Sequence, residues 1–488
     1  MQAHDVPLLI EGKHRPATGG LSYQSINPVT REVSGRAAAA SVADAEAAAA
    51  SAAAAFPDWS ARGPNHRRTC LLQAASLLEE RSAESARVMA EEIGATLRWC
   101  AFNTQIGAAM LREAASLTTA IRGEILPTDT PGATSLALRR PVGVVLGMPP
   151  WNAPVILGLR AVAAPLACGN TVVLKSSELC PQSHHMIGEL MHDAGMTGGI
   201  VNVISNAPGD ADRVVQALIA HPAIRRLTFT GSTRVGRSIA RMAAEQLKPA
   251  LLELGGKAPL LVLADADLAA AARAAAFGAF FNQGQICMST ERLIVEAPVA
   301  DRFAGMVAEL ARPLISGDPR TGAAPLGPII GVGAVARLRE LVEDAVARGA
   351  EIVAGGRFHD TYMDATVLDH VTPAMRIYSE ESFGPVAALI RVGSADEAVR
   401  VANDTEYGLA AAVFSRDFNK AFDIAMRIES GICHINAPTV QDEAQVPFGG
   451  VKASGYGRFG GTAAIDEFTE LRWVTFTDRP GGSADHLF

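Results

Sequence analysis

Apolar and polar residues along the chain follow two different periods. Residues 36–56 are alanine-rich and residues 67–94 carry apolar side chains at helical spacing, which predicts that the first 120 residues are mostly helical after an N-terminal arm. From residue 140 onward, short β-rich runs alternate with longer segments of helical period. This alternation predicts a parallel, doubly wound sheet.

The region after residue 140 divides into two blocks, each with its own sheet. In the first block we expect strands at 142–146, 171–175, 200–205 and 225–230, and helices from Pro154, at 181–195, 210–220 and 232–247. In the second we expect strands at 250–256, 258–263, 292–296 and 351–356, a helix containing Cys287 and a long helix near 330–350. Residues 471–477 are short, apolar and β-rich, which suggests a strand that pairs with another subunit.

One uncharged stretch, residues 141–159, is long enough to span a membrane. Pro149, Pro150 and Pro154 would remove hydrogen-bond donors and clash within a single helix. We therefore expect a short strand, a bend and a helix here, and no membrane span.

Composition is typical of a compact protein of about three folding units. The 488 residues are 49 % hydrophobic and 19 % charged, and the net charge is −8 without a basic block, so nucleic-acid binding is not expected. Six cysteines without CxxC spacing predict neither a disulfide framework nor a zinc site. These cysteines, and an N-terminus without the layout of a signal peptide, favour a cytoplasmic location.

The first candidate for a reactive side chain is Cys287, which lies among small and amide side chains in the segment FFNQGQICMST. Gly284 would let backbone approach closely, and a helix-associated thiol near a cationic cofactor would be partly thiolate. Lone buried cysteines are usually inert, however, and no histidine lies near Cys287. The pair Cys433–His434 falls in a predicted strand, so a Cys–His–acid hydrolase has no support.

Two further side chains have chemical and structural interpretations. Asn152 lies in a proline-flanked turn before a helix, where its amide suits either an oxyanion donor or a helix N-cap. Glu253 ends an apolar run, where burial would favour the protonated form and a role as base and acid. A salt-bridged glutamate at the end of a strand is the alternative for Glu253.

The ends of two predicted strands carry candidate ligands for a nucleotide. A strand ending at Thr230 is followed by Gly231 and a helix from Ser232 or Thr233, which predicts an anion site. The segment is neither a P-loop, since Arg237 replaces the lysine, nor a GxGxxG fingerprint. Lys175 and Glu178 follow another strand and would bind ribose hydroxyls, with Glu178 repelling a 2′-phosphate; a surface salt bridge is the alternative.

Eight segments, in chain order over nearly the full length, resemble the motifs of the NAD(P)-dependent aldehyde dehydrogenase superfamily. They are PPWN, KSSE, FTGSTRVG, LELGGK, FNQGQICMST, EESFGPV, ANDTEYGL and PFGGVKASGYGR. Within this superfamily, residues 151–184 and 429–461 look like the vanillin and salicylaldehyde dehydrogenases.

The resemblance implies an α/β fold of two doubly wound parallel-sheet domains and a small β element for oligomerisation. Residues 1–120 and 142–254 would form the dinucleotide-binding domain, 255–468 the catalytic domain, and 121–141 with 469–488 the oligomerisation element. It also implies a homodimer or homotetramer that uses NAD, with NADP possible, and no metal.

Site residues follow from the same resemblance. Cys287 would attack an aromatic aldehyde, Asn152 and the Cys287 backbone N–H would hold the oxyanion, and Glu253 would activate the water that hydrolyses the thioester. The implied cofactor contacts are Trp151, Lys175, Glu178, Gly231, Ser232, Gly236, Leu254, Glu381 and Phe383. The implied substrate contacts are Trp99, Ala153, Leu157, Arg160 and Met288.

Three departures from the family pattern lie near Asn152. Pro149 replaces an alanine, Ala153 replaces an aromatic residue, and Arg160 with Ala161 replaces a Trp-Lys pair. Leu157 and Arg160 follow Ala153 at about one helical turn each, so this face would admit a planar ring with Arg160 near a phenolic oxygen. Pairing of Arg160 with a structural carboxylate is the alternative.

Other functions remain open at this point. A cofactor-independent thiol hydrolase or thioesterase would use Cys287 without NAD⁺, and a dehydrogenase of this family could act on semialdehydes or aliphatic aldehydes instead. A catalytically silent protein is disfavoured because Cys287, Glu253 and Asn152 are all present.

Overall fold

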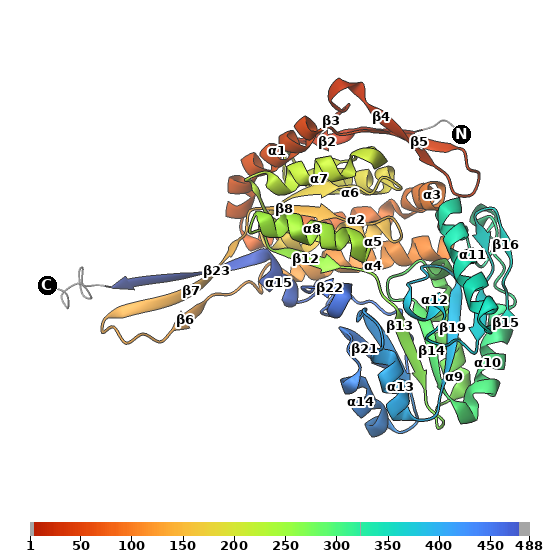
Figure 1. Ribbon diagram of the computed structural model, residues 1–488. Coiled ribbons are helices and arrows are strands. Elements are labelled where there is room, and N and C mark those ends of the chain that lie inside the picture. The colour runs from red at the N-terminus through yellow and green to blue at the C-terminus, as the bar shows by residue number, and fades with distance from the viewer. Residues whose placement is uncertain (1–3, 323, 478–488) are drawn as a thin grey trace.

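The computed structural model describes residues 4–322 and 324–477. Two large sheets flanked by helices form the body of the molecule, and a narrow three-stranded arm projects from it (Figure 1). Residues 478–488, the end of the expected oligomerisation element, and residues 1–3 of the expected dinucleotide-binding domain lie outside the described residues.

The N-terminal arm consists of short strands. Strands β1 (His4–Val6), β4 (Ser22–Ile26) and β5 (Val33–Ala38) form a small sheet, and β2 (Leu8–Ile10) and β3 (Lys13–Arg15) form a hairpin at the edge of the first large sheet.

The alanine-rich helix begins at Val42 rather than at residue 36, which corrects the sequence expectation. Ala37 and Ala38 pair in register with β4, and this pairing outweighs the helix propensity of alanine. Ser41 then starts α1 (Val42–Ala61) through a reciprocal capping box with Asp44. Three more helices follow as expected: α2 (Pro64–Glu80), α3 (Ser82–Ile93) and α4 (Leu97–Leu117).

The first large sheet has eight strands in the order β22-β12-β11-β8-β9-β10-β2-β3. Its five central strands are parallel: β8 (Val144–Met148), β9 (Thr171–Lys175), β10 (Val201–Ile204), β11 (Ile224–Thr230) and β12 (Ala250–Glu253). The helices between them are α5 (Pro154–Ala167), α6 (Pro181–Asp193), α7 (Ala211–Ala220) and α8 (Thr233–Glu245). Helices α2 to α6 pack in one apolar core and α1, α7 and α8 in another, so both faces of the sheet are covered.

Strand β8 begins two positions later than expected. Gly143, in the expected strand, has a φ of 126° and ends the regular extended backbone there. The strand, bend and helix predicted for the uncharged stretch are otherwise present. Among the described residues, no helix is long and apolar enough to cross a membrane.

The second large sheet has seven strands in the order β15-β18-β19-β14-β13-β20-β21. The strands are β13 (Ala258–Val262), β14 (Thr290–Glu296), β15 (Glu351–Ala354), β18 (Thr366–Asp369), β19 (Val386–Val392), β20 (Ala410–Phe414) and β21 (Ile432–Ile435), and β15 alone among them pairs antiparallel. Helices α9 (Leu268–Phe280) and α10 (Ala297–Ala311) pack on one face. Helices α11 (Val332–Ala347), α13 (Ala395–Asn403) and α14 (Phe418–Arg427) pack on the other.

The projecting arm is an antiparallel sheet of β6 (Glu124–Leu126), β7 (Ala133–Pro141) and β23 (Thr469–Thr477). The expected strand at 471–477 therefore pairs with β7 of its own chain along its whole length. Large apolar side chains remain exposed on this sheet, among them Ile125 at 80 % and Trp473 at 74 %.

After β21 the chain returns to the first sheet. Strand β22 (Gly455–Tyr456) pairs antiparallel with β12, where Gly455 lies opposite Glu253. The remaining short elements are α12 (Arg376–Ser379), α15 (Ala463–Phe468), β16 (Phe358–His359), β17 (Tyr362–Met363) and the 3-10 turns η1 (Thr18–Gly20), η2 (Pro208–Asp210), η3 (Phe281–Gly284), η4 (Pro319–Thr321) and η5 (Lys452–Ser454). The predicted fold class is confirmed, while the assignment of residue ranges to cofactor binding, catalysis and assembly stays a prediction.

Candidate active site

A cavity of about 260 Å³ is lined by the carboxyl ends of β8, β11 and β12 and by segments of the second block. Ten of the predicted site residues line it: Trp151, Asn152, Leu157, Gly231, Ser232, Glu253, Leu254, Cys287, Glu381 and Phe383. Pro150, Thr230, Gly255 and Arg337 complete the lining and were not predicted. Lys175, Glu178, Gly236, Trp99, Ala153, Arg160 and Met288 do not line it.

Cys287 lies in a turn after α9 and η3, not within a helix, which corrects the sequence expectation. Asn282 and Gln283 adopt left-handed conformations with φ of 49° and 55°, and these break the helical path. Gly284 follows with φ of 69°, and a Cβ there would lie 2.1 Å from the Gly384 carbonyl oxygen. The close backbone approach predicted at Gly284 is therefore real, and it fixes the turn that presents Cys287.

The Asn152 side chain is directed to the cysteine turn. Its Nδ2 donates to the Gln285 backbone carbonyl at 2.9 Å, while the backbone carbonyl of Asn152 accepts from Trp99 Nε1 at 2.8 Å. The residue at the N-cap of α5 is Ala153, so the capping interpretation of Asn152 is wrong. Because an amide carries two N–H hydrogens, one remains for an acceptor in the cavity.

Glu253 is a fully buried carboxyl group at the end of β12. Neither of its side-chain oxygens has a hydrogen-bond partner in the described part of the chain, so the salt-bridge interpretation is wrong. Burial raises the pKa of Glu253 to about 7, against the smaller lowering effects of Cys287 and Arg160. The same burial, with the charge of Glu253, raises the pKa of Cys287 well above its ordinary value.

Lys175 and Glu178 form an ion pair at the carboxyl end of β9, with 2.7 Å between Lys175 Nζ and Glu178 Oε1. Lys175 is only 8 % exposed, so this is not the solvated surface pair considered as an alternative. Burial is the largest single effect and would raise the pKa of Glu178, but the charge and hydrogen bond of Lys175, together with further hydrogen bonds from backbone and Asn206, make the net shift downward. Glu178 also accepts from Asn206 Nδ2 at 3.0 Å.

The predicted anion site lies at the start of α8. Ser232 is the N-cap of this helix, and its hydroxyl accepts from the Val235 N–H. Gly236 packs against Leu254, where a Cβ would come within 2.4 Å of a Leu254 methyl carbon. The first turn of α8 therefore lies close to the loop after Glu253, with its free N–H groups at the same sheet edge as Lys175.

The loop at residues 381–383 closes the cavity on the side of the second sheet. Glu381 Oε1 accepts from the Gly256 N–H at 2.9 Å, and the Phe383 ring packs edge-on against Trp151 at 5.9 Å between centroids. Arg337, on α11, donates to the carbonyls of Glu381 and Ser382. Sequence reasoning missed Arg337 because it is one of several charged residues on an amphipathic helix.

A second residue that was not predicted, Glu291, also binds the loop at residues 381–383. Its carboxylate accepts from the N–H groups of Ser382 and Phe383 and pairs with the buried Lys257. Glu291 lies four positions after Cys287, in β14, so it ties this loop to the strand that follows Cys287.

Arg160 pairs with Asp442, and both side chains are buried. Its guanidinium carbon also lies 4.1 Å from the centre of the Phe448 ring. The interpretation of Arg160 as partner of a structural carboxylate is therefore the one the geometry favours. Trp99, Ala153 and Met288 are buried in the apolar core behind the cavity.

Comparison with known proteins decides the family. The model of the aldehyde dehydrogenase family matches residues 15–474. The chain belongs to the aldehyde dehydrogenase family. Its members are NAD(P)-dependent oxidoreductases, so the resemblance found in the sequence motifs is confirmed.

Similar members of the family act on named aromatic aldehydes. A vanillin dehydrogenase of Pseudomonas fluorescens is 57 % identical over 476 residues, which cover 98 % of each chain. A salicylaldehyde dehydrogenase of Pseudomonas putida is 49 % identical over 455 residues, covering 93 % of this chain and 94 % of the other. The crystal structure of the salicylaldehyde dehydrogenase of Pseudomonas putida G7 with salicylaldehyde superposes with a TM-score of 0.96 at 46 % identity, covering 97 % and 98 % of the chains.

The residues of this aldehyde dehydrogenase fit a dinucleotide cofactor. Lys175 with Glu178 and the first turn of α8 lie at carboxyl ends of parallel strands, where ligands of such sheets bind. The unpartnered Glu253 and the cavity beside Cys287 leave room for the reacting end of the cofactor and the substrate.

We predict that Glu253→Gln becomes increasingly stabilising relative to the wild type as pH rises. Folding raises the pKa of Glu253 from 4.5 to about 7, so its stabilising contribution is complete below pH 4.5 and is lost as pH rises through 7. Glutamine does not ionise, so the difference in free energy of unfolding should grow by about 3 kcal/mol between pH 4.5 and pH 8. Denaturant titrations at a series of pH values measure it.

Glu406→Gln is the matched control, because Glu406 is exposed and pairs with Arg237 on the surface. Its difference from the wild type should change little over the same range. Parallel stability profiles for Glu253→Gln and the wild type would contradict the assignment of a raised pKa to Glu253.

Proposed function

We propose that this protein oxidises an aromatic aldehyde to the carboxylic acid with NAD⁺ as the electron acceptor. The observation that carries the proposal is the meeting of Cys287, Asn152 and the unpartnered carboxyl of Glu253 in one cavity. The substrate class is supported by relatives whose names specify vanillin and salicylaldehyde, both aromatic aldehydes.

Cys287 is the nucleophile of the proposed reaction. Its Sγ attacks the aldehyde carbon while its proton passes to Glu253, since the raised pKa of the thiol requires a base for this step. The aldehyde oxygen becomes an oxyanion that accepts hydrogen bonds from Asn152 Nδ2 and the Cys287 backbone N–H. A nicotinamide cofactor, when bound, would supply the acceptor for the hydride that leaves the former aldehyde carbon.

Glu253 serves the second half of the reaction. Loss of the hydride leaves a thioester on Cys287, and Glu253 releases its first proton to solvent before taking another from the attacking water. A carboxyl with a pKa of about 7 exchanges protons in both directions near neutral pH. Hydrolysis then yields the carboxylate and restores the Cys287 thiol.

The remaining contacts divide between the cofactor and the aldehyde. We assign the adenosine ribose to Lys175 and Glu178, and the other cofactor contacts to Trp151, Gly231, Ser232, Gly236, Leu254, Glu381 and Phe383. For the aromatic ring we propose a site against Leu157, backed by Trp99, Ala153 and Met288. Arg160 shapes this wall through its pair with Asp442.

The purified protein should produce NADH from NAD⁺ and vanillin, salicylaldehyde or benzaldehyde, with kcat/KM about tenfold or more above that for an aliphatic semialdehyde. Cys287→Ala should abolish this signal because the nucleophile is lost. Cys433→Ala, which removes a thiol from β21 outside the cavity, is the matched control and should keep the wild-type rate.

Two results would contradict this function. Undiminished NADH formation by Cys287→Ala would exclude the thiol mechanism. Turnover of a thioester by the wild type without NAD⁺, with no NADH formed from any aldehyde, would indicate the thiol hydrolase instead.

Glu178 should favour NAD⁺ over NADP⁺ because its ionised carboxylate repels a 2′-phosphate. We predict that Glu178→Gln raises the ratio of kcat/KM for NADP⁺ to that for NAD⁺ about tenfold. Glu406→Gln, an exposed glutamate paired with Arg237, is the control and should leave the ratio unchanged. A ratio that is equal in the wild type and Glu178→Gln would remove Glu178 from the ribose site.

We also propose that the projecting arm joins two copies of the chain into a homodimer, or four into a homotetramer. Support comes from the apolar side chains left exposed on its strands, including Ile125, Leu471, Trp473 and Phe476. Exposed apolar groups gathered on one element mark association surfaces.

The double change Leu471→Glu and Trp473→Glu should therefore weaken assembly. Placing two charges in an apolar contact should cost enough to raise the dissociation constant more than about tenfold, measured by sedimentation velocity over a concentration series. Leu247→Glu tests general surface effects, because Leu247 is 92 % exposed but lies after α8, away from the arm. Equal sedimentation of the arm variant and the wild type at every concentration would refute this role of the arm.

A further inference from the structure

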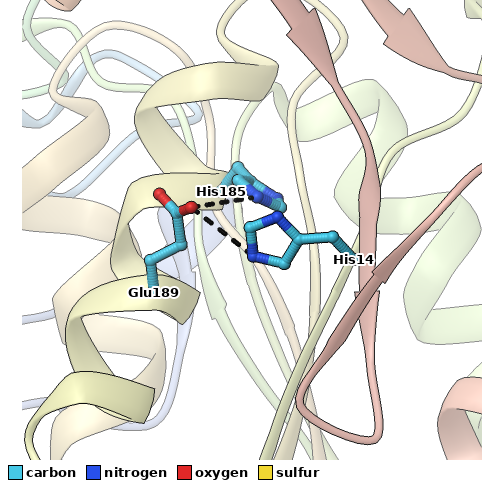
Figure 2. A group of neighbouring side chains, drawn as sticks. All are labelled: His14, His185 and Glu189. Atoms are coloured by element: carbon cyan, nitrogen blue, oxygen red, sulfur yellow. Dashed lines mark ion pairs between the residues drawn. The ribbon is translucent and has the colours of Figure 1, made fainter.

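Three side chains with atoms that can bind a metal lie close together at the edge of the first large sheet that β2 and β3 form. His14 is on β3, and His185 and Glu189 are on α6 (Figure 2). The positions of His185 and Glu189, four residues apart, place them on one face of the helix. Their ligand atoms and that of His14 all lie within 4.8 Å of one another.

The distances match those in a tetrahedral metal site. The same Glu189 oxygen, Oε1, lies 3.5 Å from His14 Nε2 and 3.7 Å from His185 Nε2. Ligands about 2.0–2.2 Å from a Zn²⁺ ion are about 3.3–3.6 Å apart at tetrahedral angles. Two of the three edges of the triangle are therefore within a few tenths of an ångström of the required length.

His185 is a buried histidine whose ring nitrogens lack hydrogen-bond partners among the described residues. It is 5 % exposed, and neither ring nitrogen has a hydrogen-bond partner in the described part of the chain. Its neighbour His184 is equally buried, but there Nδ1 accepts the Ser177 N–H at 3.1 Å. Buried polar atoms without partners are rare in folded proteins, because each costs the free energy of its lost hydration.

A simple histidine–glutamate ion pair does not account for the group. His185 Nε2 lies 3.7 Å from Glu189 Oε1, beyond hydrogen-bond distance, and both of its ring nitrogens are left without a partner among the described residues. A neutral imidazole whose ring nitrogen carries an unpartnered lone pair is the form that binds transition metals.

Charged groups around the three ligands also favour a cation. The carboxylates of Asp193 and Glu84 are electrostatic neighbours of Glu189, together with His14 and Arg81. The nearby guanidinium of Arg81 is itself paired with Asp193.

We propose that His14, His185 and Glu189 form a binding site for a divalent transition metal of the zinc class, with solvent as the fourth ligand. Two imidazoles and one carboxylate are the nitrogen and oxygen donors that Zn²⁺, Co²⁺ and Ni²⁺ prefer. The site links the β2–β3 hairpin to α6, the helix that follows Lys175 and Glu178. The bound ion therefore stabilises the N-terminal hairpin on the first sheet and takes no part in the reaction at Cys287.

Cobalt binding by the full-length protein tests the site. After treatment with a chelator and desalting, the wild type should bind one Co²⁺ per chain, with visible absorption of a tetrahedral site and without a thiolate charge-transfer band. Zn²⁺ should displace the cobalt and raise the thermal midpoint of the protein.

His14→Gln and Glu189→Gln should each weaken Co²⁺ binding at least about tenfold, because loss of groups that only orient ligands already has that effect. His14 tolerates substitution, since half of its side chain is exposed. His359→Gln, at an exposed histidine on β16, and Cys287→Ala should both bind like the wild type. Unchanged binding by His14→Gln, loss of binding in either control, or no binding by the wild type would overturn the proposal.

Discussion

A buried ion pair between Lys257 and Glu291 holds together the segments that make the active site. Lys257 lies between the strand that ends at Glu253 and β13, and Glu291 lies in β14, just after Cys287. Both side chains are almost fully buried, so neither is stable without the other. Because Glu291 also binds the N–H groups of Ser382 and Phe383, one pair sets the relative positions of Glu253, Cys287 and the loop at residues 381–383.

Glu253 differs from the other buried carboxyl groups because neither of its oxygens has an ion-pair or hydrogen-bond partner among the described residues. Glu178 is held by Lys175, Glu291 by Lys257 and Asp442 by Arg160, whereas the Glu253 carboxyl has no such partner among the described residues. A paired carboxylate stays ionised and is a poor proton carrier, while an isolated buried one exchanges its proton near neutral pH. Glu92 and Glu381 also lack a cationic partner, but both accept hydrogen bonds from backbone N–H groups. Of these buried carboxyl groups, only Glu253 has both oxygens without a partner in the described part of the chain.

The positions of candidate residues at the ends of strands could be predicted from the sequence. Positions that depend on tertiary contacts could not. Glu253 and Gly231 lie at strand ends beside one cavity, as expected, because parallel strands bring their carboxyl ends to one edge of a sheet. The helix expected at Cys287 was wrong, because nothing in the residue types of Asn282 and Gln283 reveals that both turn left-handed. The sequence around Asp442 did not indicate its structural role, because that role is an ion pair with Arg160, far away in the chain.

The return of the chain after β21 has a consequence for biosynthesis. Strand β12, which carries Glu253, gains its outer neighbour β22 only when residues 455–456 have been made. Until then the edge of β12 is unpaired in a chain growing on the ribosome. The sheet that carries Glu253 is therefore completed late in translation, after every other strand of the two large sheets has been made.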